Sequence, residues 1–590
     1  MQLGKTIKRG VLPTFFVLIA MLIVACGGPS SPGNGPTAVT KAAADKQILV
    51  LPQEGIADIK TFDPGKSTDA PSIAAIDLVF TGLVQLDDKL QVRDQLAASH
   101  SLAADGLTWT FKLKPNLKFS DGTPLTSADV VYSINRALQP SLKSITSPAY
   151  LNLIKDSDKM LAGKIPTIIN DSLLTPDPQT VVIITNKKAA YFLDALTYST
   201  SYVIEKSLVT KYGDNGFADH LADNGGIGGD GPWVVSKYVH GKDIEFTPNP
   251  NYYGPHPQLK KLVMPFYKVA DTTYKAYQVN QVDAAAVPTA QLASAKALPN
   301  GQFHLIPNLW IAYYSMNYLV KPFDNLKIRQ AFALAINKTT IAHDIYKDLV
   351  TPTNHIVPQG MPGFDTTLTG PMGVKGTTGD QTLAKQLFAQ GMQESGYTLA
   401  TFPAITFTVA TGGAADARNE FQADQQMWQN TLGVKVNIND EDFNKLLTDV
   451  PAATNNPKGL QMWSIAWIAD YPDAQDWLTL QFDNGAANNN MNFGQNSTSD
   501  AAAQAAAQKT MEQADVNPDP ASRLQQYYTA EQQLVNDVAW LPIYQVNSAV
   551  VRKPCVTGVI DNAQQLTPPD DWAGIYISTA SPCADASSFQ

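Results

Sequence analysis

The stretch "DGLTWTFKLKPNLKFSDGTPLTSADVVYSINR", residues 105–136, constrains the fold more than any other part of the chain. Between Leu107 and Leu113, large apolar residues alternate with polar ones, which predicts a half-buried strand. Asp121-Gly122 is a turn signal. Thr126, followed three residues later by Asp129, predicts the capped start of a helix. The unit is therefore strand, turn and capped helix, with no nucleophile or metal cluster.

Strands and helices alternate in both halves of the chain, so the fold class is α/β, with mixed α+β character and more than one sheet. A chain of 590 residues exceeds one hydrophobic core, and two or three domains are expected. The predicted elements are strands at 47–52, 404–410 and 434–438, a turn and strand within 174–185, a hairpin after the glycine-rich loop that begins at 225, helices at 72–83, 415–432 and 519–537, and a closing strand in "VAWLPIYQ".

The N-terminus has the pattern of an export signal. Basic residues precede an apolar stretch from Val11 to Ala25, which is too short to span a bilayer comfortably. It ends at Cys26 in a sequence that resembles a bacterial lipobox, which implies cleavage of residues 1–25 and lipid attachment to Cys26; a plain secretory signal is the alternative. Residues 26–45 are rich in Gly, Pro, Ser and Ala and predict a flexible linker.

Two further cysteines, Cys555 and Cys583, lie near the C-terminus. In an exported chain an even pair favours a disulfide, with two unpaired thiols as the alternative. A metal site is not expected, because two cysteines and no histidine after His355 cannot supply the usual four ligands.

Nothing in the sequence favours an enzyme or a nucleic-acid-binding protein. The net charge of −10 argues against a polyanionic partner. Nucleophile-elbow, His-Glu-x-x-His and Walker A motifs are absent. The glycine-rich loop leads into a strand and is interpreted as a tight turn, and Arg329 as a structural ion pair. We expect no catalytic residues, cofactor or metal.

The segment "WIADYPDAQDW", from Trp467 to Trp477, combines aromatic rings with three aspartates. On a helix Asp470, Asp473 and Asp476 would share one face, as paired acids or calcium ligands do. Pro472 interrupts such a helix, so the spacing alone does not support catalysis.

Seven motifs in order resemble the family 5 extracellular solute-binding proteins, the oligopeptide- and dipeptide-binding components of ABC importers. The motifs are "FDP" with "FTGLVQLD", the 105–136 stretch, "GGDGPWVV", "NPNYYG", "NLKIRQAFALAINKTTI", "WIADYPDAQDWL" and "AWLPIY". The sequence departs from the family pattern at Asp230, Asn337 and Ala474; the first two are interpreted as structural, whereas Ala474 lies beside the expected ligand site.

The resemblance implies a periplasmic-binding-protein-like fold of two lobes with a hinge and three domains. Motif order places domain I at 46–85, 216–308 and 544–590 (which includes the C-terminal tail), domain II at 86–215 and domain III at 309–543.

The family also implies a ligand site. Its tryptophan-loop aspartate, here Asp470, pairs with the α-ammonium of a peptide, and Trp467 and Tyr471 provide flat walls. Trp477 is expected to be a core residue. No carboxylate-binding partner is identifiable.

The expected function is capture of extracellular peptides between the lobes and delivery to ABC permease subunits. The expected protein is a monomer, exported and lipid-anchored at the outer face of the cytoplasmic membrane, with no nucleic-acid partner. The alternatives are the same scaffold binding an oligosaccharide, opine, glutathione, nickel or haem, and, more remotely, an enzyme or structural surface protein.

Overall fold

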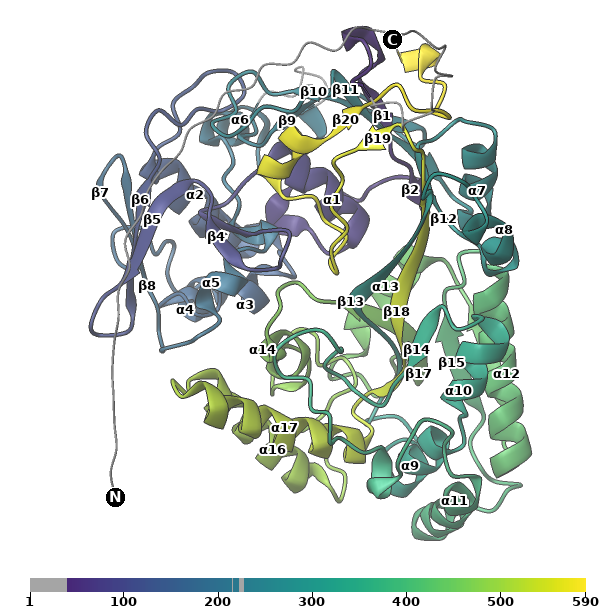
Figure 1. Cartoon of the computed structure of the whole chain (residues 1–590). Helices are drawn as coiled ribbons and strands as arrows, with labels where there is room; N and C mark the ends of the chain where they lie inside the picture. The colour runs from purple at the N-terminus through teal and green to yellow at the C-terminus, as the bar shows by residue number, and fades with distance from the viewer. Residues whose placement is uncertain (1–39, 215, 222–227, 590) are drawn as a thin grey trace, which may run out of the picture. The chain divides into compact units, whose positions relative to one another are not determined.

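The computed structural model describes residues 40–214, 216–221 and 228–589 (Figure 1). Its first sheet joins strands from distant parts of the chain in the order β1-β11-β10-β9, with β2 also paired to β11. β1 runs parallel to β11, and the other neighbours in that order are antiparallel. The strands are β1 Ile48–Val50, β2 Gln53–Glu54, β9 Trp233–Val239, β10 Asp243–Pro248 and β11 Lys261–Tyr267. The predicted first strand and the hairpin after the glycine-rich loop are confirmed.

The second sheet has the order β5-β6-β8-β7 and is antiparallel. Its elements, with the helix that follows β6, are β5 Ala97–Leu102, β6 Thr108–Leu113, β7 Leu173–Asp177, β8 Thr180–Ile184 and α2 Ser127–Ala137. The Asp129 carboxylate accepts from the N–H and the hydroxyl of Thr126, each at 2.9 Å, so the predicted capped helix is confirmed. The first part of 174–185, expected as a turn, belongs to β7 instead, because an edge strand tolerates Pro176.

The third sheet is built on two long strands, β13 and β18, which lie side by side and antiparallel (Figure 1). Its order is β12-β18-β13-β17-β15-β16, with β14 also paired to β18. The strands are β12 Ala284–Ala286, β13 Phe303–Met316, β14 Val350–Pro352, β15 Ile405–Val409, β16 Val436–Asp440, β17 Met462–Ile468 and β18 Leu541–Arg552. At one end of this pair, Val551 of β18 belongs to one hydrophobic cluster. At the other end, Tyr314 and Met316 of β13 belong to another.

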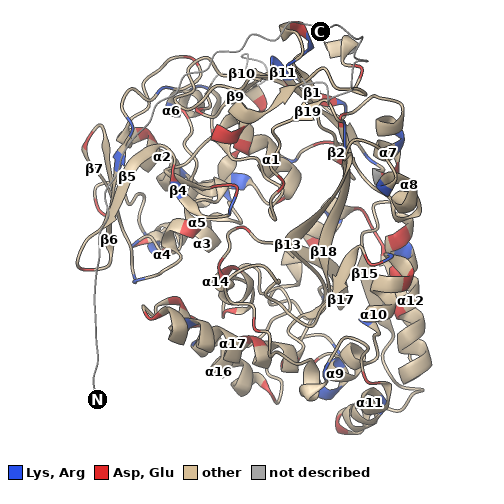
Figure 2. Ribbon diagram, viewed as in Figure 1, with Lys and Arg blue, Asp and Glu red and all other residues tan. Residues whose placement is uncertain are grey.

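Helices α12 (Ala415–Leu432) and α17 (Pro520–Asp537) match the predicted ranges to within one residue. Further helices are α1 Ala70–Val79, α9 Leu326–Leu334, α11 Gln381–Ser395 and α16 Ala501–Asp515. Acidic and basic residues are interspersed along α12, whereas the charged residues of α9 are basic (Figure 2).

The sheets follow the predicted domain ranges in outline. The second sheet lies within 86–215, and the first draws on 46–85 and 216–308. The predicted borders at 308/309 and 543/544 fall inside β13 and β18, where the β13–β18 register shifts between Pro307 and Ile311. The division into three domains itself stays a prediction.

The glycine-rich loop packs directly on the C-terminal end of α1. A Cβ at Gly229 would lie 2.1 Å from the Val79 carbonyl oxygen, and one at Gly231 would lie 2.6 Å from the Val79 carbonyl carbon. Asp230 between them is buried and accepts from the Thr81 N–H at 3.0 Å and hydroxyl at 2.6 Å. Gly229 and Gly231 therefore make a close backbone contact, which accounts for these two glycines without a phosphate ligand.

Residues 40–42, which we assigned to the flexible linker, instead pair with the C-terminal segment. Lys41 forms a bridge with Ser578, and the Ala42 N–H donates to the Ile577 carbonyl at 2.9 Å. The predicted linker range is therefore too long at its C-terminal end, where residues 40–42 pair with residues 577–579. The predicted signal, Cys26 and the rest of the linker lie outside the described residues. Among the residues described, no helix has the length and apolar character needed to span a membrane.

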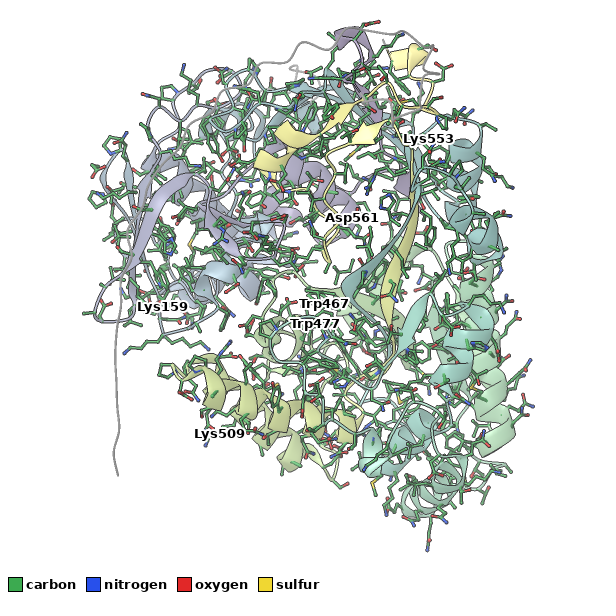
Figure 3. All side chains as sticks on the ribbon, in the orientation of Figure 1. Lys159, Trp467, Trp477, Lys509, Lys553 and Asp561 are labelled. Atoms are coloured by element: carbon green, nitrogen blue, oxygen red, sulfur yellow. A yellow bond between two sulfur atoms is a disulfide. The ribbon has the colours of Figure 1, made fainter. Side chains whose placement is uncertain are left out.

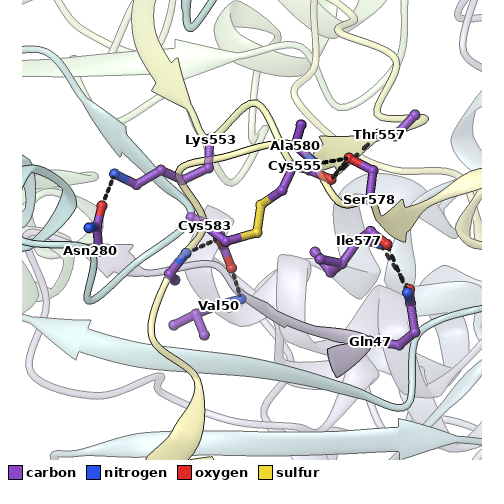
Figure 4. Close-up of a disulfide and its surroundings, with 12 residues drawn as sticks. Gln47, Val50, Asn280, Lys553, Cys555, Thr557, Ile577, Ser578, Ala580 and Cys583 are labelled. Atoms are coloured by element: carbon purple, nitrogen blue, oxygen red, sulfur yellow. Dashed lines mark hydrogen bonds between the residues drawn. A yellow bond between two sulfur atoms is a disulfide. The ribbon is translucent and has the colours of Figure 1, made fainter. Parts of the chain in front are cut away.

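A disulfide joins Cys555 to Cys583, with the two Cα atoms 5.6 Å apart (Figure 4). Asp283 lies beside it and accepts from the Val50 N–H and the Ala584 N–H, both at 2.9 Å. Burial raises the pKa of Asp283 to about 6. The first strand of the chain and the segment after Cys583 are therefore fastened to one buried carboxylate.

Replacing both cysteines, Cys555→Ala with Cys583→Ala, is expected to lower the free energy of unfolding by about 3 kcal/mol, because the bond closes a loop with a sequence separation of 28. Urea unfolding measures the change. A reducing agent should destabilise the wild type similarly and leave the double variant unaffected. Equal stability of wild type and variant would contradict the prediction.

Candidate functional site

The Trp467–Trp477 segment leaves the third sheet at the end of β17 and ends in the short helix α14 (Ala474–Trp477) (Figure 3). The Ala469 N–H donates to the Leu309 carbonyl at 2.9 Å, and the Ala469 carbonyl accepts from Gln564 Nε2 at 2.7 Å. The segment is thus positioned by β13 on one side and by a C-terminal loop on the other.

Asp473 fixes the turn of this segment. It is the N-cap of α14, accepting from the Gln475 N–H at 2.9 Å, and it forms two hydrogen bonds of 2.7 and 2.8 Å with the Arg523 guanidinium on α17. Both side chains of this ion pair are largely buried. Asp473 therefore has a structural role.

Asp476 links two other residues of the same segment through hydrogen bonds. Its side chain is 0 % exposed, and its Oδ2 accepts from Trp467 Nε1 at 3.1 Å and from the Asp470 N–H at 3.2 Å. In the described part of the chain its other oxygen, Oδ1, has no hydrogen-bond partner. Burial, followed by the nearby charge of Asp470, raises the pKa of Asp476 well above its usual range.

Asp470 contacts the range 86–215, which contains the second sheet. The hydroxyl of Tyr150, in the short helix α3 (Ser147–Tyr150), donates to Asp470 Oδ2. Asp470 is half-buried, and desolvation raises the pKa of its carboxyl well above the usual range. None of the ion pairs formed by the described residues includes Asp470 or Asp476. Two adjacent carboxylates thus lie in a desolvated region without a cation.

Tyr471, in the Trp467–Trp477 segment, forms an aromatic cluster with three tyrosines from the range 86–215. The Tyr471 ring meets Tyr150 edge-on at 6.3 Å and stacks with Tyr191 at 6.4 Å, while Tyr150 stacks on Tyr198 at 3.8 Å. Tyr471 is 1 % exposed, and its hydroxyl donates to Gln475. A ligand can reach Tyr471 only when these rings separate, whereas Trp467 is half-buried.

The sequence pattern did not identify Tyr150, Tyr191 or Tyr198. Each lies in a short loop or single-turn helix without periodicity, and only the fold brings them to Asp470 and Tyr471. An aromatic residue preceding a loop carries no signal of this kind by itself.

Three further large side chains are structural. Trp233 and Trp477 are fully buried in two different hydrophobic clusters. Arg329 is 0 % exposed, pairs with Asp500 and donates to the Asp537 and Phe323 carbonyls.

The departures from the family pattern at Asn337 and Ala474 are also accounted for. Asn337 caps a short helix, accepting from the Thr340 N–H at 3.1 Å. Ala474 is the first residue of α14, a position where proline is also compatible with a helix, so alanine there leaves the loop geometry intact.

Comparisons with known proteins point to one family. Residues 91–489 match the family model of the bacterial extracellular solute-binding proteins, family 5. The oligopeptide-binding protein OppA of Bacillus subtilis is 25 % identical, covering 94 % of this chain and 97 % of that protein. The glutathione-binding protein GsiB of Escherichia coli O1:K1 is 24 % identical, covering 74 % of this chain and 77 % of that protein. The Escherichia coli murein tripeptide binding protein MppA superposes with a TM-score of 0.77 at 22 % identity, covering 90 % of this chain and 99 % of that one. This likeness confirms the predicted fold class.

The Asp473–Arg523 pair should stabilise the segment measurably. Asp473→Asn keeps a good N-cap but leaves the Arg523 charge buried and unpaired, so we expect a loss of about 3 kcal/mol in chemical unfolding. Asp442→Asn is the matched control, because Asp442 is an exposed N-cap outside any ion pair of the described residues. Similar losses for both variants would show that capping, not the ion pair, stabilises the loop.

Proposed function

Since the chain belongs to the bacterial extracellular solute-binding proteins of family 5, we propose that it captures peptides and delivers them to the membrane subunits of an ABC importer. The family consists of solute-binding proteins, not enzymes. The relatives named above as binding oligopeptides and a murein tripeptide support a peptide ligand.

The observation that carries the proposal is the desolvated carboxylate of Asp470, which has a hydroxyl donor in Tyr150 and no ion-pair partner among the described residues. A buried peptide ammonium needs such an anion, because leaving either charge unpaired costs several kcal/mol. The half-buried indole of Trp467, which hydrogen-bonds to Asp476, would provide a flat wall beside the ammonium.

Ligand entry would require the Tyr471 ring to separate from Tyr150 and Tyr191. β13 and β18 run from the hydrophobic cluster that contains Val551 to the cluster that contains Tyr314 and Met316. We assign the hinge between the lobes to the shift in the β13–β18 register after Pro307. The domain borders predicted at 308/309 and 543/544 are retained as part of this proposal.

The alternative ligand with an observation behind it is glutathione, because a relative is named for binding it. Glutathione also carries an α-ammonium, so Asp470 would serve it equally well. The two ligands are therefore separated by direct binding, not by the presence of an anion.

Asp470→Asn should weaken binding of trialanine, tetraalanine and pentaalanine by about 30-fold, or about 2 kcal/mol, since it removes a charged partner of the ammonium. Calorimetry measures the affinity. N-acetylated versions of the same peptides lack the ammonium and should bind weakly to wild type, with little further loss in the variant.

A thermal-shift screen of the wild type distinguishes peptides from glutathione as the ligand. A peptide present at 100 times its Kd stabilises the protein by about 2.7 kcal/mol. Stabilisation by glutathione but by none of the peptides would replace the peptide proposal with the alternative, and unchanged peptide affinity in Asp470→Asn would remove Asp470 from the site.

We further propose that the chain works as an exported monomer anchored by lipid on Cys26 at the outer face of the cytoplasmic membrane. Cys26→Ala should abolish incorporation of labelled palmitate and move the protein out of the membrane fraction, because the sulfur that carries the lipid is lost. Ser31→Ala in the same segment is the control. Retention of Cys26→Ala in the membrane fraction would contradict the anchor.

A further inference from the structure

We propose that Asp470 and Asp476 share a proton and that the ammonium of an arriving peptide expels it, so that capture is coupled to pH. This inference rests on the function proposed above and concerns the regulation of that same site. It begins with the geometry: Asp476 is 0 % exposed, and its Oδ2 accepts from the Asp470 backbone N–H at 3.2 Å.

The second observation is the orphaned oxygen of Asp476. Oδ2 already accepts two hydrogen bonds, but Oδ1 is buried and has no partner within the described ranges. A buried, charged carboxylate oxygen without a hydrogen-bond donor costs free energy. Protonation removes the charge and leaves fewer lone pairs that need a donor. The site is therefore arranged for a group that is neutral when no cation is present.

Among the described residues, no ion pair gives Asp470 or Asp476 a compensating positive charge. The titratable groups facing the pair are Tyr150 of α3, Tyr191 and Tyr198 near α5 (Phe192–Ala195), Tyr471 on the segment itself and Asp473. Burial raises the pKa of Tyr191, Tyr198 and Tyr471 and keeps these three tyrosines neutral, and the Tyr150 hydroxyl donates to Asp470. The charge of Arg523 is matched by Asp473 through two hydrogen bonds.

Two carboxylates that interact in a desolvated region lose their protons in separate steps that belong to the pair. The raised pKa values of Asp470 and Asp476, caused chiefly by burial, agree with this. With no peptide bound, the pair holds one proton and a single negative charge.

A peptide ammonium provides a positive charge at the same place. When it binds, the pair no longer needs the proton, which passes to the buffer, and the two carboxylates face one ammonium. One proton is released for each peptide bound. By linkage, affinity then rises with pH by up to tenfold per unit and levels off above the pKa of the free pair.

The first test needs no ligand. A difference titration of wild type against Asp476→Asn reports where the pair loses the shared proton; asparagine keeps the acceptor for Trp467. The midpoint should lie well above about pH 4, the ordinary range of an aspartate. A midpoint in the ordinary range overturns the proposal whether or not peptides bind.

The second test is calorimetry of tri-, tetra- and pentaalanine at one pH in phosphate and in Tris, whose ionisation enthalpies differ. The dependence of the heat on the buffer should correspond to about one proton released in wild type and to markedly less in Asp476→Asn. Asp194→Asn is the matched control: burial raises the pKa of this nearby carboxyl to about 7, but Asp194 is not hydrogen-bonded to Asp470.

The outcomes separate this proposal from the function on which it rests. Peptide binding without proton release, or an equal loss of release in Asp194→Asn, overturns the coupling and leaves peptide capture standing. Absence of peptide binding with a raised titration midpoint overturns the peptide function and the release step together, while the titration still supports the shared proton.

Discussion

The antiparallel pairing of β13 with β18 is the constraint on which the rest of the structure depends. These strands are more than 200 residues apart in sequence, yet they run side by side from one hydrophobic cluster to another. Their pairing fixes where β17 can add to the sheet, because Trp467 lies opposite Ile311 of β13. The position of the aspartate-rich segment therefore follows from a backbone ladder, not from the segment itself.

Within that segment three similar side chains have different environments. Asp473 is neutralised by Arg523 and caps a helix, Asp476 is sealed beneath the backbone, and Asp470 meets a hydroxyl from across the aromatic cluster. An aspartate's chemistry is set by desolvation and by the charge next to it. The one with an arginine partner secures the loop, and the other two form no ion pair with any described residue.

The sequence predicted the local elements well where a local cause existed. Alternation around Trp109 and the Thr126–Asp129 cap are short-range patterns, and both elements form as expected. The pairing of residues 40–42 with the C-terminal segment was missed because local composition does not indicate which distant segment a backbone will pair with. Tyr150 was missed for a similar reason, since its meeting with Asp470 spans 320 residues.

The pairing of the first described residues with the C-terminal segment has a mechanical consequence. Lys41 and Ala42 pair with Ser578 and Ile577, and Lys261, the β11 partner of Ile48, donates to the Phe589 carbonyl at 2.5 Å. A pull on the chain from the N-terminal side is therefore borne first by these terminal pairings, and the disulfide at Cys555 prevents the C-terminal partner from peeling away. β13 and β18 take no part in these pairings, so a load from the N-terminal side would reach the proposed hinge only after the terminal pairings had broken.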